Sequence, residues 1–96
     1  MIYEWDSVKS AANVKKHRVR FEEAASVFLD PLALTFPDPY HSKKEDREIT
    51  IGHSARGRVL FVAHIARGDR IRIISARRAT RREQKQYEEG TGEATA

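Results

Sequence analysis

Apolar residues recur with helical spacing in the first third of the chain and alternate with polar residues along much of the rest. After a short opening strand at residues 2–5, Asp6 is placed to cap a helix that runs through about His17. Its predicted apolar side consists of Trp5, Val8 and Ala12. A second helix is indicated by apolar residues at positions i, i+3, i+4, i+7 and i+8, which share one helical face. These residues are Phe21, Ala24, Ala25, Phe28 and Leu29, and the helix ends at Asp30-Pro31.

The second half of the chain predicts an antiparallel meander followed by a helix. Three apolar and β-branched runs are separated by turns at residues 54–57 and 67–69. The predicted strands are Glu48–Ile51, Val59–Ile65 and Ile71–Ala76. Thr80 and Glu83 form a Thr-x-x-Glu capping box, which predicts that the last helix begins there.

Two segments in the middle of the chain allow more than one interpretation. Residues 32–36 are short and apolar, and they form either a further strand or a buried extended segment. Residues 37–46 contain two prolines and a polar run, so they form a loop that either only connects or also covers a site. We therefore predict an α+β fold with the order β-α-α, a three-stranded antiparallel meander and a C-terminal helix. Residues 1–89 are expected to form one domain, and residues 90–96 a disordered tail.

Composition narrows the classes of function. The chain has 96 residues and no cysteine, which excludes disulfides, thiolate catalysis and Cys-ligated zinc. The N-terminus lacks the basic-then-apolar pattern of a signal peptide, and no apolar run has the length of a membrane span. We therefore expect a cytoplasmic protein.

Positive charge is concentrated in one part of the chain. The net charge is +4, but residues 47–85 hold eleven Lys and Arg against three Asp and Glu, a net charge of +8. Residues 1–46 carry −1 and residues 86–96 carry −3. This asymmetry favours a polyanionic partner, most simply RNA or DNA. The alternative is a charged surface that only keeps the protein solvated.

Several short motifs occur in an order and spacing that are specific as a set. They are Tyr3-Glu4-Trp5-Asp6, Lys16-His17, Phe21-Glu22-Glu23-Ala24, Asp30-Pro31, Arg47-Glu48, Gly52 and Arg58. The strongest is the stretch from Arg72 to Thr80, which leads to Glu83 and Tyr87. Together, over residues 2–89, these motifs resemble the BrnT toxin family, whose members have a RelE-like fold.

This resemblance implies a bacterial ribonuclease toxin of a type II toxin–antitoxin pair, which inhibits translation. It also implies a BrnA-like antitoxin with a ribbon-helix-helix DNA-binding part, which wraps the toxin. The pair then represses its own operon, and the toxin meets operator DNA only through the antitoxin. The sequence leaves open a second class of function, a non-catalytic basic module that binds nucleic acid or an acidic protein. It also leaves open whether the chain is a monomer or a homodimer.

The sequence departs from the family pattern between the first two helices. That pattern continues after Lys-His as Gly-Val-Ser-Phe-Glu-Glu, whereas here Arg18 replaces the glycine and Arg20 the serine. Arg18 must then adopt the left-handed conformation that glycine adopts at little cost. Arg20 cannot supply the hydroxyl of a capping box with Glu23. Both changes are expected to cost some local stability and to leave the fold intact.

The RNA cleavage that the resemblance implies is expected to need no metal ion or other cofactor. Such a reaction needs a base for the 2′-hydroxyl, cations for the charge on the phosphorus-centred transition state, and an acid for the leaving 5′-oxygen. Residues 47–85 hold too few carboxylates for a two-metal site, and the histidines lack the spacing of a zinc site. His41 and His53 look like loop residues. The candidate catalytic residues are Arg77, His64, His17 and Glu48.

Each of these four residues has a position that suits a catalytic role, and three of them also have a purely structural alternative. Arg77 is the strongest, because it lies where a strand ends beside the start of a helix. His64, near the end of the central strand, either moves protons or caps the sheet through a hydrogen bond. His17, at a helix end, is either catalytic or a favourable partner of the helix dipole. Glu48 is either a base or the ion-pair partner of a nearby arginine.

Arginines are also expected in a row on one face of the meander. Arg70 and Arg72 alternate with isoleucines and so project from the opposite face, and Arg58 on the neighbouring strand could join them. The alternative is cross-strand pairing with Glu48 or Asp69. Further arginines around the last helix would follow the RNA backbone or an acidic antitoxin, and a tyrosine there either stacks a base or packs on the sheet. The residues expected to bind RNA are Arg58, Arg70, Arg72, Arg78, Arg81, Arg82, Lys16 and Tyr87.

Overall fold

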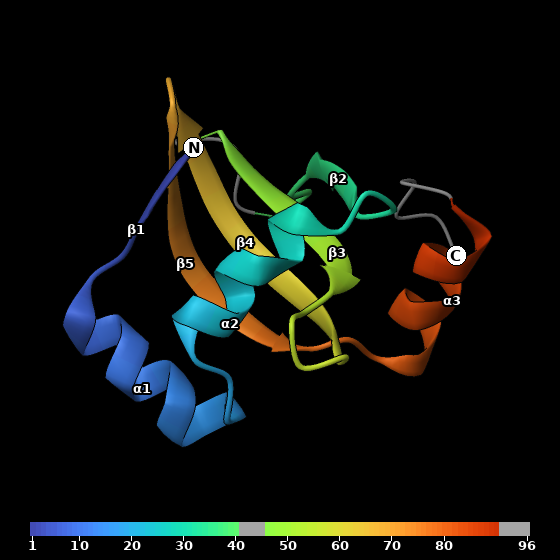
Figure 1. The fold of residues 1–96 in the computed structure, drawn as a ribbon, viewed down its shortest axis with the longest axis horizontal. Helices are drawn as coiled ribbons and strands as arrows, with labels where there is room; N and C mark the ends of the chain where they lie inside the picture. Colours follow the sequence, from blue (N-terminus) through green and yellow to red (C-terminus); the bar gives the residue numbers. More distant parts are fainter. Residues whose placement is uncertain (41–45, 91–96) are drawn as a thin grey trace.

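A mixed five-stranded sheet forms the centre of the computed structural model, which describes residues 1–40 and 46–90 (Figure 1). Its strands are β1 (Ile2–Glu4), β2 (Leu34–Pro37), β3 (Arg47–His53), β4 (Val59–Arg67) and β5 (Arg70–Arg78), in the spatial order β1-β5-β4-β3-β2. The helices are α1 (Ser7–His17), α2 (Phe21–Ser26) and α3 (Arg81–Glu89), and the 3₁₀ turn η1 (Val27–Leu29) extends α2. Of the expected tail at residues 90–96, Gly90 is the C-cap of α3, and residues 91–96 lie outside the described residues.

The sheet confirms the predicted α+β class and element order, and it has more strands than the predicted meander. β3, β4 and β5 form the expected antiparallel meander, and Gly57 and Gly68 take left-handed conformations in its turns. β2 pairs antiparallel with β3, so the ambiguous segment at residues 32–36 contributes a strand. β1 pairs parallel with β5, placing Tyr3 beside Ile71. This pairing joins distant parts of the chain, which no local pattern predicts.

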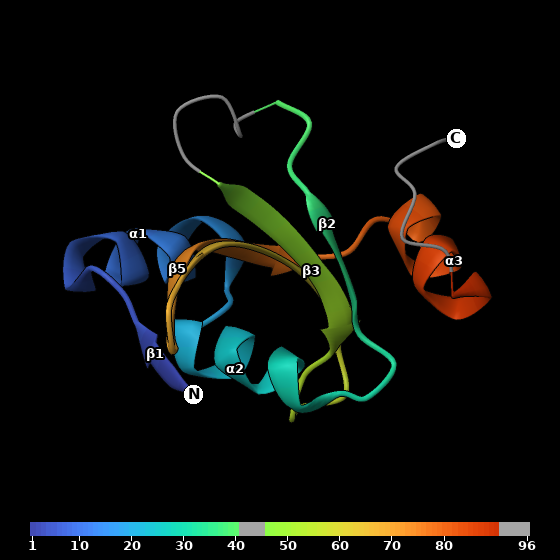
Figure 2. The ribbon, with the colours of Figure 1, turned by 90° about the horizontal axis from the view of Figure 1, so that it is seen from above.

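Helices cover both faces of the sheet, with α2 on one side and α3 on the other (Figure 2). The buried core on the α2 side consists of Val19, Phe21, Ala24, Val27, Leu60, Val62, Ile71, Ile73 and Ala76. The core on the α3 side consists of Ile49, Ile51, Ala63, Ala79 and Tyr87. In the described part of the chain, no helix is long and apolar enough to cross a membrane.

The first two helices differ in detail from their predicted apolar faces. Asp6 caps α1 as predicted, but Val8 is 76% exposed, so the predicted apolar side of α1 is wrong there. Leu29 is 80% exposed, because α2 passes into a 3₁₀ turn at Val27 and the tighter winding ends the helical face. Arg18 adopts the predicted left-handed conformation, with φ 58° and ψ 35°, and no side-chain hydrogen bond caps the start of α2.

Asn13 is the buried residue of α1, and it attaches the helix to the edge of β5. β1 pairs only with the first residues of β5, so the peptide groups of Ala76 lie beyond that pairing. The Asn13 amide donates to the Ala76 carbonyl at 2.8 Å and accepts from the Ala76 N–H at 3.1 Å. It also donates to the Val19 carbonyl at 2.9 Å. One side chain therefore takes the place of a neighbouring strand.

Replacing Asn13 with alanine is expected to lower the free energy of unfolding by about 2–4 kcal/mol, because both peptide groups of Ala76 would lose their partners at a buried edge. Urea denaturation measures the change. Val14→Ala, which shortens a more exposed side chain of the same helix, should stay within about 0.5 kcal/mol of the parent. An Asn13→Ala variant of unchanged stability would contradict this role.

Candidate functional site

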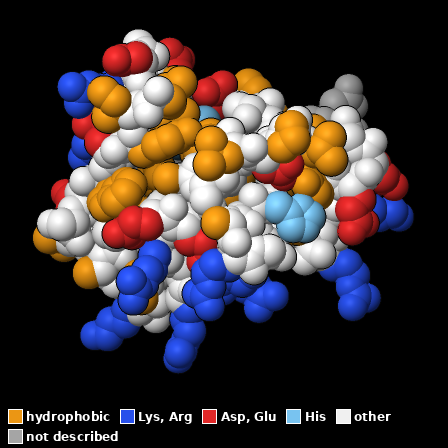
Figure 3. All heavy atoms as spheres, in the orientation of Figure 1, with side chains coloured by type: hydrophobic (Ala, Val, Ile, Leu, Met, Phe, Trp, Pro, Cys, Tyr) orange, Lys and Arg blue, Asp and Glu red, His pale blue; other side chains and the backbone are white. Residues whose placement is uncertain are grey.

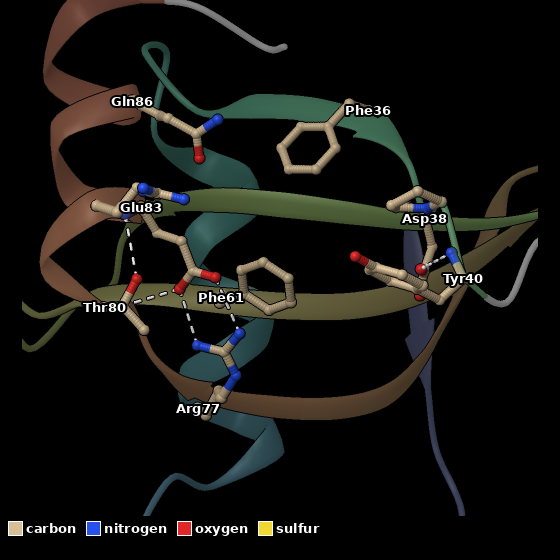
Figure 4. A pocket seen from close by; sticks show the side chains of 10 residues that line it. Phe36, Asp38, Tyr40, Phe61, Arg77, Thr80, Glu83 and Gln86 are labelled. Carbon is tan, nitrogen blue, oxygen red and sulfur yellow. Dashed lines mark hydrogen bonds and ion pairs between the residues drawn. The ribbon is translucent and has the colours of Figure 1, made fainter. Parts of the chain in front are cut away.

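A pocket of about 530 Å³ opens between α3, the sheet and the segment after β2. Its lining combines aromatic and polar side chains that come from β2, β4, β5 and α3 (Figure 4). The side chains that define its character are Phe36, Tyr40, Phe61, Arg77, Glu83 and Gln86. Of these, only Arg77 was predicted as a site residue. The pocket is therefore an arginine site with an aromatic floor.

Arg77 is held in a fixed direction by two contacts. Its guanidinium lies over the ring of Phe61, its neighbour in the β4–β5 register, at 4.0 Å from the ring centroid. Its Nη1 and Nη2 donate to the two carboxylate oxygens of Glu83 at 2.8 and 2.9 Å. The Nε–H and the second N–H of Nη2 have no hydrogen-bond partner among the described residues. This edge presents two donors, as bidentate binding of a phosphate requires.

Glu83 serves both the arginine and the start of α3. Its carboxylate accepts a hydrogen bond from the Thr80 N–H at 2.9 Å, and the Thr80 hydroxyl accepts one from the Glu83 N–H at 3.2 Å, which confirms the predicted capping box. Burial alone would raise the pKa of Glu83, but the hydrogen bonds from Arg77 and Thr80 outweigh it and lower the pKa below its ordinary value. Glu83 is therefore an ionised partner that positions Arg77.

A β-bulge determines the face on which Arg77 lies. The β4–β5 register shifts between Ala63 and His64, which leaves Ile74 as an extra residue in β5. Ile73 and Ala76 consequently both lie in the core on the α2 side, although strict alternation would separate them. Without the shift, Arg77 would share the α2 side with Ile73.

His64 lies on the other side of the sheet from Arg77. It shares the α2 side with Leu60 and Val62, as predicted, and only 2% of its surface is exposed. Its Nε2 is 2.7 Å from the Thr50 hydroxyl, and the Phe28 ring packs edge-on against it. Burial lowers the pKa of His64 to about 4, so the imidazole is neutral at neutral pH.

The other two predicted acid–base residues lie in different surroundings. Glu48 is the register partner of His64, and it alternates with Thr50 toward the α2 side. His17 lines a small groove between α1 and β5 together with Lys16 and Ser75. His17 thus shares a groove with β5, the strand that carries Arg77, whereas His64 adjoins β5 from the α2 side.

The predicted row of arginines is only partly present. Arg58 precedes β4 and pairs with Glu23 of α2, its Nε donating to Oε2 at 2.9 Å, so it faces α2 instead of the row. Arg70 lies 3.7 Å from Glu4 of β1. The alternative of cross-strand pairing with Glu48 or Asp69 is wrong for these two arginines, because the residues that pair with them come from elements distant in sequence. Arg72 alternates with buried isoleucines, as predicted.

Tyr87 packs on the sheet, one of the two alternatives that its sequence position left open. Its hydroxyl donates to Asp30 at 2.6 Å and lies 2.9 Å from His53 Nδ1. Burial, together with the neighbouring Asp30 carboxylate, raises the pKa of Tyr87 to about 12. His53 is the last residue of β3 and not part of a loop, and His41 lies outside the described residues.

Exposed cations follow one edge of the molecule. Figure 3 shows Lys and Arg side chains along the lower edge, where α1, the β3–β4 turn and the start of α3 meet. The exposed cations in or next to these segments include Lys9, Lys15, Lys16, Arg18, Arg20, Arg56, Arg78, Arg81 and Arg82. Arg82 lines the pocket. Within residues 1–40 and 46–90, no three His, Asp or Glu side chains are grouped to hold a metal ion.

The chain is similar to known toxins in sequence and in fold. Residues 5–83 match the family described as ribonuclease toxin, BrnT, of type II toxin–antitoxin systems. The crystal structure of the Brucella abortus ribonuclease toxin BrnT matches with a TM-score of 0.65 at 24% identity, covering 84% of this chain and 100% of that one. No curated protein sequence matches the chain.

The Glu23–Arg58 pair predicts a loss of stability in acid. Hydrogen bonds from Arg58 lower the pKa of Glu23 below 4.5. Between the lowered pKa and pH 4.5, the Glu23 carboxyl therefore takes up a proton in the unfolded chain and stays ionised in the folded chain. The stabilisation is complete above about pH 4.5 and is lost as the pH falls through the lowered pKa. Urea denaturation at a series of pH values should show that the free energy of unfolding falls less steeply with decreasing pH in Glu23→Gln than in the parent. Glu22→Gln, an exposed neighbour, should follow the parent; equal slopes in all three proteins would contradict the assignment.

Proposed function

The chain belongs to the BrnT family of ribonuclease toxins of type II toxin–antitoxin systems, and we propose that it cleaves RNA in the pocket beneath α3. In the proposed reaction, which needs no metal ion, a ribose 2′-hydroxyl attacks the adjacent phosphorus. The 5′-oxygen leaves with a proton, and a 2′,3′-cyclic phosphate forms. The observation that carries the proposal is the guanidinium of Arg77, fixed between Phe61 and Glu83 with one edge open.

Arg77 would stabilise the negative charge that develops on the phosphoryl oxygens. A donor that is already fixed before the reaction needs no reorganisation as charge develops, which is why such groups contribute strongly to catalysis. Glu83 uses the terminal edge of the guanidinium and thereby aims the Nε edge at the substrate. The ion pair thus fixes the orientation of the guanidinium before RNA binds.

We assign to His17 the role of the base that accepts the 2′-hydroxyl proton, and the leaving 5′-oxygen takes its proton from water. His17 is partly exposed, and its groove includes Ser75, two residues before Arg77 on β5. Two strand residues span ~7 Å, so an extended RNA strand along β5 could contact both groups. His64 and Glu48 have no step in this proposal, because they face the α2 side. Lys16 and the exposed arginines of the basic edge would hold the RNA backbone.

The proposal extends to the partners of the toxin. A type II toxin implies a cognate antitoxin and an RNA substrate. We propose that cleavage inhibits translation, that a BrnA-like ribbon-helix-helix antitoxin neutralises the toxin, and that the pair represses its operon with only the antitoxin contacting the operator. The basic edge supports an acidic partner, and Leu29 and Leu32, 80% and 70% exposed, support one with apolar groups.

Incubation of the purified chain with a structured RNA in excess EDTA tests the reaction. We expect fragments that end in 2′,3′-cyclic phosphate. In Arg77→Lys the cleavage rate should fall by about 100-fold or more, because lysine keeps the charge and loses the bidentate geometry. Arg67→Lys, the same exchange at an exposed arginine at the end of β4 and outside the basic edge, is the matched control and should cleave at nearly the parent rate. Thermal unfolding of each variant shows that the fold is retained.

Two outcomes would contradict the proposal in different ways. Intact RNA with salt-sensitive binding would favour a non-catalytic basic module. Cleavage that persists in Arg77→Lys would place the reaction elsewhere on the molecule.

The role of His17 predicts a rate defect without a binding defect. His17→Gln should slow single-turnover cleavage by about 10²-fold or more, because general acid–base catalysis typically contributes 10²–10⁴-fold. Affinity for a 2′-O-methyl RNA, which lacks the attacking hydroxyl, should change little. An unchanged rate in His17→Gln would exclude His17 and leave the role of Arg77 intact.

A further inference from the structure

Tyr40 stands at the mouth of the pocket with 86% of its surface exposed. Its backbone is fixed by a hydrogen bond from its N–H to the Asp38 carboxylate at 2.9 Å. Figure 4 shows its ring pointing over the sheet toward Phe61. An aromatic ring that buries so little surface adds little to folding stability, and at the pocket mouth its faces are accessible to a ligand.

The floor of the pocket supplies further aromatic surface. Phe36 and Phe61 come from β2 and β4, and both rings remain partly exposed. In Figure 4 the two rings stand on the floor of the pocket on either side of β3, with Tyr40 pointing toward Phe61 from one side and Gln86 toward Phe36 from the other. Gln86 brings an amide, which carries both donors and an acceptor. Flat apolar surfaces with one polar group at the rim suit a flat ring with a hydrogen-bonding edge.

We propose that this pocket binds one unpaired nucleobase of the RNA substrate, stacked on the aromatic side chains and with its edge toward Gln86. The inference rests on the proposed function, because Arg77 beside Phe61 would hold the phosphate of the same nucleotide. Stacking accepts every base, since all four have a flat π-face. Gln86 then determines which base is preferred, because its amide discriminates between base edges.

Binding to 2′-O-methyl RNA oligomers of U, C, A or G, compared with an abasic oligomer of the same length, tests the proposal without cleavage. The parent should bind its best oligomer about 5- to 100-fold more tightly than the abasic one. Tyr40→Ala should lose most of that ratio and Tyr40→Phe should keep it. Because Tyr40 is exposed, neither change should affect thermal stability. Gln86→Ala should reduce the differences among the four oligomers.

A second variant separates aromatic stacking from packing. Phe36→Leu keeps an apolar side chain without a flat face, and Phe28→Leu makes the same change on the opposite side of the sheet. Phe36→Leu should weaken the binding of base-containing oligomers, and Phe28→Leu should leave it unchanged.

The outcomes distinguish this inference from the proposed function. Equal affinity of the parent for abasic and base-containing oligomers would overturn the base site, even if RNA is cleaved. Base-dependent binding that falls in Tyr40→Ala, without any cleavage, would support the base site and overturn only the nuclease reaction.

Discussion

The extra residue in β5 decides the chemistry of both faces of the sheet. Side chains of a regular strand alternate, so a single inserted residue moves all that follow to the other face. With Ile74 inserted, Ala76 enters the core under α2 and Arg77 lies over Phe61 on the α3 side. The same shift leaves the Ala76 peptide groups to Asn13, which holds α1 beside this part of β5. The position of the arginine and the attachment of α1 therefore depend on one irregularity.

Helix α3 is held over the pocket by polar contacts at both of its ends. Its first turn is joined to β5 by the Arg77–Glu83 pair, and its last turn is joined to Asp30, after η1, and to His53 of β3 through the Tyr87 hydroxyl. Tyr87 is the buried residue of this helix, whose other side chains are mostly charged or polar. A helix with so little apolar surface gains little from burial, so its hydrogen bonds determine where it lies. Removing one partner of a partly buried pair leaves the other without compensation, which couples the pocket to the fold.

Local signals in the sequence predicted the elements well and the contacts between them poorly. The caps at Asp6 and Thr80, the turns and the left-handed Arg18 were all predicted, because each depends on a few adjacent residues. The parallel pairing of β1, the Glu23–Arg58 pair and the aromatic floor of the pocket join distant segments, and no local pattern contains them. Phe61 had one usable signal, its place in the strand next to the arginine-bearing strand.

The contrast between His64 and Arg77 shows why residue type alone does not define a site. Both lie in the central strands, and both were predicted as catalytic. His64 is enclosed by Phe28 and bonded to Thr50, whose hydroxyl is 2.8 Å from that of Thr35, so its imidazole belongs to a polar link across β2, β3 and β4. Burial keeps it neutral, with a pKa of about 4, and gives it no path to a substrate. Arg77 lies at the pocket, with the terminal edge of its guanidinium bound to Glu83 and the Nε edge open. The chemistry therefore follows from the face and the neighbours that the fold gives each side chain.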